Sequence, residues 1–164
     1  MSVVNRIVPC LWFDHQAEEA AKFYTSIFKN SKITNTCYYG EAGYEFHKKK
    51  AGSVMVVSFE IEGQRYDALN GGPLFKFSEA VSLQVMCDTQ AEIDYYWDKL
   101  TKDGEEGPCG WLKDKFGFSW QVVPKVLEEM LTDPDESKRE RVMNAYLQMK
   151  KYDISLLEKA FEGK

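Results

Sequence analysis

The chain has 164 residues, of which 44% are hydrophobic and 14% aromatic, with five prolines. This length and composition exclude a disordered chain and predict a single domain over residues 1–164. There are 26 acidic residues and 21 Lys and Arg, so the net charge is −5. Nucleic acid or an anionic membrane surface would require a positive field, so we expect neither as a partner.

The start of the sequence and its cysteines bear on the compartment. Residues 1–6 lack the apolar core of a signal peptide, and no stretch reaches the roughly 18 apolar residues of a membrane span. The four cysteines have no short paired spacing, which favours reduced thiols over a disulfide framework or a zinc ribbon. We therefore expect a cytoplasmic protein.

An internal repeat organises the sequence. Residues 13–18 read Phe-Asp-His-Gln-Ala-Glu and residues 87–92 read Cys-Asp-Thr-Gln-Ala-Glu, so four identities recur between the two segments. Each copy follows a β-rich run, at residues 7–13 and 80–87, and opens a helical pattern. The repeat predicts two units of one kind, each a strand, a helix and three strands, over residues 3–76 and 77–124.

Helical spacing places one helix after the first strand of each unit. Apolar residues recur at steps of three and four over residues 17–28, with Asp14 as the expected N-cap. In the second helix Thr89 and Glu92 form a capping box, and Gly104 stands at the expected left-handed C-cap. Strands are expected at 32–39, 53–61 and 65–70, then at 105–112 and 118–123, with a tight connection at 113–117.

A helical extension follows the repeat, over residues 125–164. Its apolar residues recur at helical spacing and need cover, either from the same chain or from a second subunit. The sequence leaves both alternatives open. The expected helices are 126–131, 136–151 with Asp133 as N-cap and Pro134 in the first helical position, and 154–161 with Asp153 as N-cap.

Three segments carry a family resemblance. They are Pro9-Cys-Leu-Trp-Phe-Asp with Ala17-Glu-Glu-Ala-Ala-Lys-Phe-Tyr, then Ala68-Leu-Asn-Gly-Gly-Pro, and finally Gly107-Pro-Cys-Gly-Trp-Leu-Lys-Asp-Lys-Phe-Gly-Phe-Ser-Trp-Gln. The chain resembles the vicinal-oxygen-chelate superfamily (glyoxalase, bleomycin resistance, dioxygenase), and within it the PhnB-like branch labelled 3-demethylubiquinone-9 3-methyltransferase domain. The resemblance implies an α+β fold of two βαβββ units with curled mixed sheets, inward residues facing a ligand, and a homodimer.

The resemblance also indicates where metal ligands would lie. Metal-using members carry His and Glu at four strand positions, because a divalent ion needs several convergent ligands. Here these positions are Pro9, Asn70, Ser82 and Gln121. Pro9 has no side-chain donor atom, and neutral amides and hydroxyls bind transition metals weakly. We therefore expect no metal and no cofactor, and we interpret the two histidines, His15 and His47, as capping or surface residues.

The same resemblance implies a substrate-binding pocket in which Cys109 and Trp111 lie beside Gln121. An indole face stacks on planar rings, and the neutral polar groups would orient a ligand. The alternative is that these polar groups bond one another or water and that Trp111 is a core residue. No histidine neighbours Cys109 in the sequence, so we do not expect it to be a nucleophile. The expected binding residues are Asn70, Ser82, Cys109, Trp111 and Gln121.

Three functions remain as alternatives. The first, which we favour, is metal-independent binding or conversion of a planar or quinone-like metabolite. The second is the methyltransferase activity named in the family label, although the sequence shows no glycine-rich S-adenosylmethionine motif and leaves it uncertain whether the protein is an enzyme. The third is a non-catalytic structural dimer.

Overall fold

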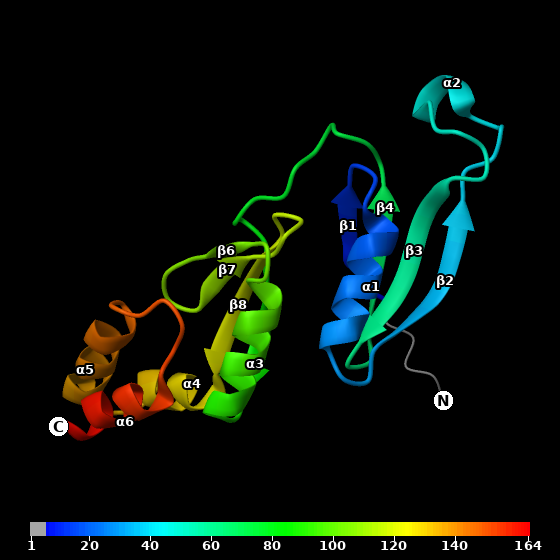
Figure 1. Cartoon of the computed structure of the whole chain (residues 1–164). Helices are drawn as coiled ribbons and strands as arrows, with labels where there is room; N and C mark the ends of the chain where they lie inside the picture. Colours follow the sequence, from blue (N-terminus) through cyan, green and yellow to red (C-terminus); the bar gives the residue numbers. More distant parts are fainter. Residues whose placement is uncertain (1–5) are drawn as a thin grey trace. The chain divides into compact units, whose positions relative to one another are not determined.

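The computed structural model describes residues 6–164 and contains two compact units, one ending at Lys76 and one beginning at Phe77 (Figure 1). Each unit holds a four-stranded mixed sheet, with strand orders β1-β4-β3-β2 and β5-β8-β7-β6. The α+β class and the repeated unit predicted from the sequence are confirmed. No helix in the described part of the chain is long and apolar enough to cross a bilayer.

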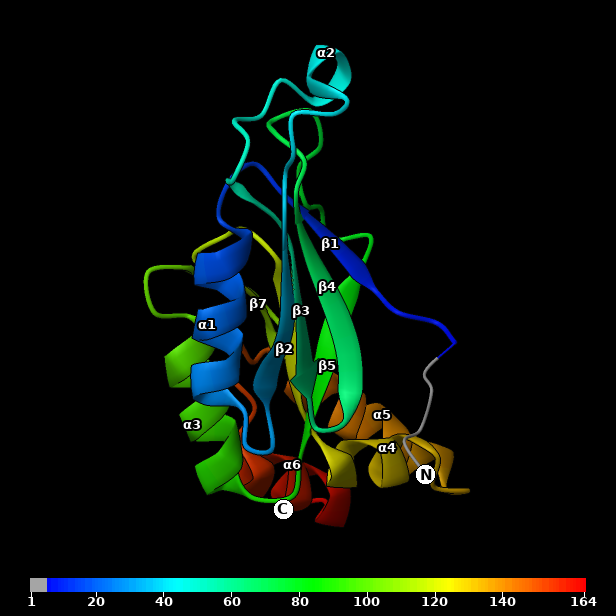
Figure 2. The ribbon, with the colours of Figure 1, turned by 90° about the vertical axis from the view of Figure 1, so that its right-hand side faces the viewer.

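In the first unit a helix lies along one face of the sheet (Figure 2). The helix forms because its small and apolar residues recur at steps of three and four, and these residues are the buried ones. Tyr24 of this helix packs against Phe59 of the sheet, with ring centroids 5.9 Å apart. The elements are β1 (Cys10–Phe13), α1 (Ala17–Ile27), β2 (Lys32–Tyr38), α2 (Tyr44–His47), β3 (Val54–Ile61) and β4 (Gln64–Asn70).

The short helix α2 lies between β2 and β3 and was not predicted. Left-handed backbone flanks it, at Gly43 (φ 80°) and at Lys48 (φ 54°). Nδ1 of His47 accepts a hydrogen bond from the backbone N–H of Lys49 at 2.9 Å, and the imidazole lies 4.7 Å from the ring of Tyr39. His47 therefore holds the turn after α2.

The second unit repeats this plan, with α3 packed against one face of its sheet. Ile93, Trp97 and Leu100 are the buried residues of α3, and the predicted capping box of Thr89 and Glu92 is present. The strand expected over 105–112 is instead split into two short strands by the turn at 107–110. The elements are β5 (Ser82–Cys87), α3 (Gln90–Leu100), β6 (Glu105–Glu106), β7 (Trp111–Lys113) and β8 (Ser119–Pro124).

The cap predicted for α1 is wrong. The N-cap residue is Gln16, and its side chain makes no capping hydrogen bond. The backbone N–H of Ala17 donates instead to Oδ1 of Asn70 at 2.8 Å. Asn70 ends β4, which runs parallel to β1, so the strand pairing brings this amide to the start of the helix. A contact 53 residues away in sequence replaces the local cap expected from Asp14.

The cap predicted at the end of α3 is also wrong. The C-cap is Thr101, and the residue with left-handed backbone is Asp103, at φ 60°. Gly104 is required for a different reason, because a Cβ at this position would lie 2.2 Å from the carbonyl oxygen of Lys113. Gly104 therefore permits the close approach of the backbone around β6 and β7.

A buried aspartate shapes the connection between β7 and β8. Asp114 is 2% exposed, and its Oδ1 accepts hydrogen bonds from the backbone N–H groups of Phe116 and Phe118. Its Oδ2 accepts the indole N–H of Trp120 at 2.9 Å. The three donors satisfy this buried carboxylate and fix the tight turn predicted over 113–117.

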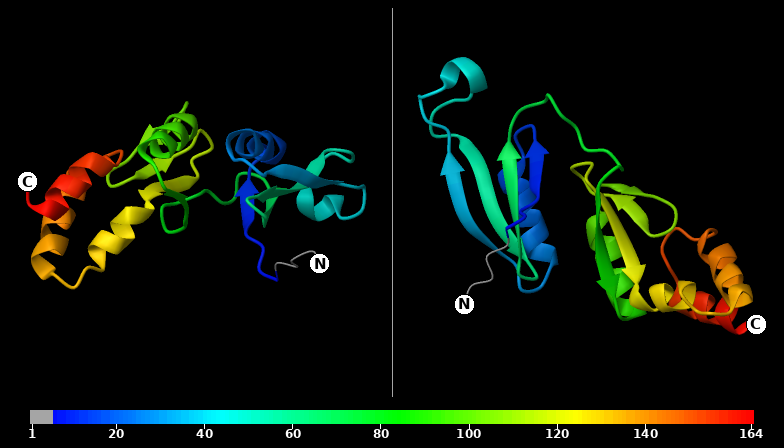
Figure 3. Two further views of the ribbon diagram at one scale, coloured as in Figure 1. Left: turned by 90° about the horizontal axis from the view of Figure 1, so that it is seen from below. Right: turned by 180° about the vertical axis from the view of Figure 1, so that it is seen from behind.

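The extension contains α4 (Lys125–Leu131), α5 (Glu136–Tyr146) and α6 (Ile154–Glu162). The predicted N-cap Asp133 is replaced by Asp135, which accepts from the backbone N–H of Ser137, and α5 ends five residues before the expected residue 151. The cap of α6 by Asp153 is confirmed. Figure 3 shows α5 and α6 side by side, and their buried residues Val142 and Leu157 give the extension its own small core.

Candidate functional site

The two faces of the second sheet differ in character. Alternate residues of a strand point to opposite faces, so Val85 and Val122 point toward α3 and are buried. The opposite face, which we call the open face, carries polar and apolar residues from three neighbouring strands. The residues of the open face are Ser82, Gln84, Met86, Trp111, Lys113, Ser119, Gln121 and Val123.

Two of the predicted site residues are bonded to each other on the open face. Nε2 of Gln121 donates to Oγ of Ser82 at 2.8 Å, and Nε2 of Gln84 donates to Oε1 of Gln121 at 3.4 Å. Ser82 and Gln121 are half-buried and uncharged. They present a neutral amide and hydroxyl pair, held in place by strand pairing, to whatever lies over this face.

A cavity of about 410 Å³ lies beside this pair, and we call it the lateral cavity. Three of the predicted residues, Cys109, Trp111 and Gln121, line it together with Gln84 and with residues of the extension. Ser82 reaches it only through its hydrogen bond to Gln121. The structure thus brings together residues that lie far apart in the sequence. It also adds a wall from α4 and α5, which agrees with the alternative in which the extension covers its own chain.

A second cavity, also of about 410 Å³, has Trp111 in its lining as well. Its lining includes Lys113 and Ser119 of the open face, together with Glu79. Lys113 and Glu79 form an ion pair, which lowers the pKa of Glu79 through the hydrogen bond from the ammonium group. Trp111 lines both cavities, so this residue borders two spaces that a ligand could enter.

The turn that carries Cys109 is fixed by the extension. The backbone N–H of Cys109 donates to the carbonyl of Met149 at 2.8 Å, and that of Gly110 donates to the carbonyl of Lys150 at 2.7 Å. Both Cys109 and Gly110 have left-handed backbone, and a Cβ at Gly110 would lie 2.4 Å from the ring of Tyr152. Glycine is therefore the residue that lets Tyr152 approach the turn.

Asn70 belongs to the first unit, whereas the other four expected binding residues belong to the second. Its amide has structural partners on both sides, because Oδ1 accepts from Ala17 and Nδ2 donates to the carbonyl of Val54 at 3.1 Å. The side chain lies on the α1 side of the sheet, and the residue is 8% exposed. These two bonds give Asn70 a role in holding α1 to the sheet.

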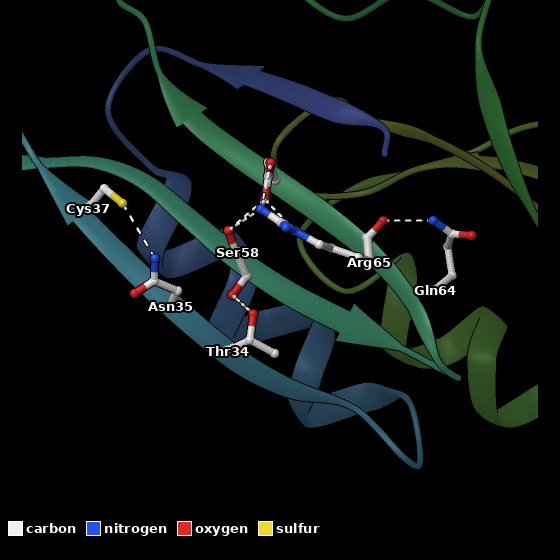
Figure 4. Close-up of polar contacts among 7 residues, drawn as sticks. Thr34, Asn35, Cys37, Ser58, Gln64 and Arg65 are labelled. Atoms are coloured by element: carbon white, nitrogen blue, oxygen red, sulfur yellow. Dashed lines mark hydrogen bonds and ion pairs between the residues drawn. The ribbon is translucent and has the colours of Figure 1, made fainter. Parts of the chain in front are cut away.

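A polar cluster in the first unit was not singled out from the sequence (Figure 4). Nη2 of Arg65 donates to Oδ1 of Asp67 at 3.0 Å and to Oγ of Ser58 at 3.2 Å, and Oγ of Ser58 donates to Asp67 at 2.6 Å. Burial, with the charge of Asp67 as a smaller cause, raises the pKa of the nearby Cys10 thiol. The sequence could have indicated this cluster, because the polar residues at 58, 65 and 67 face one side of two paired strands. The cluster satisfies its own charges.

Metal ligands do not gather in the described part of the chain. Within residues 6–164, no three side chains of His, Cys, Asp or Glu lie close enough to hold an ion together. The predicted metal positions Ser82 and Gln121 are bonded to each other, and the carbonyl of Pro9 accepts the backbone N–H of Asp67 as part of the sheet. The donor set on the open face therefore suits hydrogen bonding to a neutral group.

The sequence matches a known protein family and a solved relative. Residues 5–123 match the family described as 3-demethylubiquinone-9 3-methyltransferase. The PhnB protein of Bacillus cereus, which carries the same methyltransferase name, is 36% identical, with a TM-score of 0.63 over 73% of this chain and 99% of that chain. No functionally curated protein matches the sequence.

More distant solved structures share the fold alone. A protein from Pseudomonas aeruginosa is 19% identical, with a TM-score of 0.58 over 72% of this chain and 96% of that one. The fosfomycin resistance protein FosX from Mesorhizobium loti is 14% identical, with a TM-score of 0.55 over 80% of this chain and 99% of that one. These likenesses agree with the glyoxalase and bleomycin-resistance fold expected from the sequence.

Proposed function

Because the chain belongs to the 3-demethylubiquinone-9 3-methyltransferase family of the vicinal-oxygen-chelate superfamily, we propose that its second unit binds a planar or quinone-like small molecule without a metal ion. The observation that carries the proposal is the position of Trp111. Its half-buried indole lines two cavities and lies opposite Gln121 in the strand register. A flat apolar surface next to a neutral amide suits a planar ring that carries a carbonyl oxygen.

The chemistry available at this site is hydrogen bonding and stacking. Gln121 and Ser82 offer amide and hydroxyl groups, which can donate to a ligand carbonyl once the ligand competes for their mutual bond. The proposal therefore includes metal independence. Elemental analysis of protein purified without an affinity tag tests this part, and we expect no stoichiometric zinc, nickel or iron. About one such ion per chain would contradict it.

The binding test uses duroquinone, a planar quinone whose ring is fully substituted, with tryptophan fluorescence as the readout. Trp111→Ala should remove most of the quenching, and Gln121→Ala should weaken binding by about 1 to 2 kcal/mol, through one lost hydrogen bond. Trp12→Phe is the matched control, because Trp12 is half-buried in the first unit, where its indole N–H bonds the carbonyl of Gly72. If both test variants lose stability while binding is unchanged, these residues are core residues.

The methyltransferase reading is the alternative, and it is supported by the family name. It requires a site for a methyl donor. Calorimetric titration with S-adenosylmethionine distinguishes the two, since a saturable heat in the micromolar range would favour the methyltransferase. A third reading, a non-catalytic dimer, predicts that neither compound binds and that mass spectrometry finds no co-purified ligand.

A further inference from the structure

The helical extension lies outside the region that the family shares. The family match ends at residue 123, before α4 begins at Lys125. The Bacillus cereus relative is covered over 99% of its length by only 73% of this chain. Whatever the extension contributes to the lateral cavity is therefore an addition to the family's common fold.

The extension is fixed firmly to the second unit. Gln90 of α3 donates from Nε2 to the carbonyl of Tyr152 at 3.0 Å, and its Oε1 accepts the backbone N–H of Ile154 at 2.9 Å. An ion pair joins Lys151 to Asp94 of α3 at 2.7 Å. Together with the two backbone hydrogen bonds to the Cys109 turn, these contacts hold the extension in place as one wall of the lateral cavity.

This wall is aromatic and carries one charge. Tyr146 and Tyr152 line the same cavity as Trp111, and their ring centroids are 6.3 Å apart. Burial raises the pKa of Tyr152, so its phenol is neutral at physiological pH. Glu128 is the single Asp, Glu, Lys or Arg in the described lining of the cavity, and its carboxylate has no ion-pair partner within residues 6–164.

Electron-rich ring faces beside a carboxylate attract a positive charge. A cation over an aromatic ring is attracted by the ring electrons, and a nearby carboxylate adds a Coulomb attraction that water and salt reduce. An anionic ligand would meet repulsion from Glu128 with no Lys or Arg in the described lining to offset it. The net charge of −5 acts in the same direction over longer distances.

We infer that the extension selects, among planar ligands of this site, those that carry a positive charge. Glu128 attracts the cation through its carboxylate, and Tyr146 contacts it through its aromatic ring. The inference rests on the proposed function, because it takes Trp111 as the stacking surface. Glu128 and Tyr146 are specificity-determining residues contributed by a segment outside the family match.

A matched pair of probes tests the inference. N-methylacridinium and acridine have the same ring system, and at pH 8 only the first is charged. We expect the full chain to bind N-methylacridinium about five- to tenfold more tightly than acridine, with a preference that shrinks as salt is added. Glu128→Gln should remove most of this preference and leave acridine binding unchanged. Glu129→Gln is the control, because Glu128 and Glu129 are both exposed on α4 and only Glu128 lines the cavity.

A second variant separates the contribution of the Tyr146 ring to the cation preference from that of the Glu128 charge. Tyr146→Leu keeps apolar volume and removes the aromatic face, so it should reduce the preference for the cation by about two- to fivefold. Equal affinity for both probes, or a preference that survives Glu128→Gln, overturns the inference. If both probes bind equally and Trp111→Ala weakens both, the proposed function stands without it. If neither probe binds, the inference falls, and the duroquinone titration decides the proposed function separately.

Discussion

Oδ1 of Asn70, at the end of β4, accepts a hydrogen bond from the backbone N–H of Ala17, the first residue of α1, at 2.8 Å. The same amide donates to the carbonyl of Val54, so one side chain ties the helix to two strands. In the second unit the register position of Asn70 is taken by Pro124, and α3 is capped by its own Thr89. The two copies of the unit thus begin their helices by different means.

Asn70→Ala should lower the free energy of unfolding by about 2 to 4 kcal/mol, because it removes a cap and leaves a buried N–H without a partner. Urea unfolding followed by circular dichroism measures the change. Asn35→Ala is the control, since Asn35 is exposed and makes only a 3.5 Å contact to a thiol. If Asn70→Ala behaves like this control yet weakens duroquinone binding, Asn70 is a ligand-orienting residue instead.

Gln90→Ala should loosen the extension, because it breaks both hydrogen bonds to the turn before α6. Faster hydrogen exchange of the amides over residues 149–162 is the expected result, with a loss of about 1 to 3 kcal/mol. Gln16→Ala is a close control. Gln16 occupies the equivalent place in the first copy of the repeat, where its side chain makes no capping bond. Equal exchange in both variants would show that other contacts hold the extension.

Acid should weaken the start of α6. The hydroxyl of Ser155 and the backbone N–H of Leu156 bond the Asp153 carboxylate and hold its pKa below the ordinary value of 3.8. A carboxyl whose pKa is lower in the folded state stabilises that state above pH 3.8, and this contribution is lost as pH falls through the folded pKa. Hydrogen exchange of α6 between pH 5 and pH 2.5 measures it. Asp153→Asn keeps a capping oxygen without a charge, so its α6 should show a smaller acid effect.

Ser119→Ala should stabilise the second unit by about 1 to 2 kcal/mol. Oγ of Ser119 is buried and has no hydrogen-bond partner in the described structure, so removing it relieves an unpaired polar group. Ser82→Ala, at the position opposite Ser119 in the β5 and β8 register, should instead destabilise, because it removes the bond from Gln121. Thermal unfolding of both variants measures these two opposite changes in stability. A destabilised Ser119→Ala would mean that the hydroxyl has a partner in solution.

A homodimer is expected from the family resemblance, and the extension offers apolar surface for one. Met143, Leu147 and Leu156 are 44%, 52% and 48% exposed. Sedimentation should give twice the mass of one chain at micromolar concentration. Leu156→Glu should shift the equilibrium toward monomer if this surface is the contact, with exposed Leu74→Glu in the first unit as the control. A monomer for the unmodified chain contradicts the expectation.

The sequence by itself determined what depends on neighbours along the chain. The repeat at residues 13–18 and 87–92, the apolar spacing of α1 and α3, the Thr89 and Glu92 capping box and the Asp153 cap all follow from interactions within a few residues. The pairing of Cys109, Trp111 and Gln121 around one cavity came from the family resemblance, because strand register in a repeated fold fixes which residues face one way.

The tertiary structure decided what depends on residues far apart. The cap of α1 by Asn70, the split of the 105–112 strand and the need for Gly104 all arise where two strands or a strand and a helix meet. The same holds for the wall of the lateral cavity, since Glu128 and Tyr146 line the same cavity as Trp111 because Gln90 and the Cys109 turn hold the extension in place. Local pattern carries no information about such contacts, because their energy depends on a packing that the whole unit must first adopt.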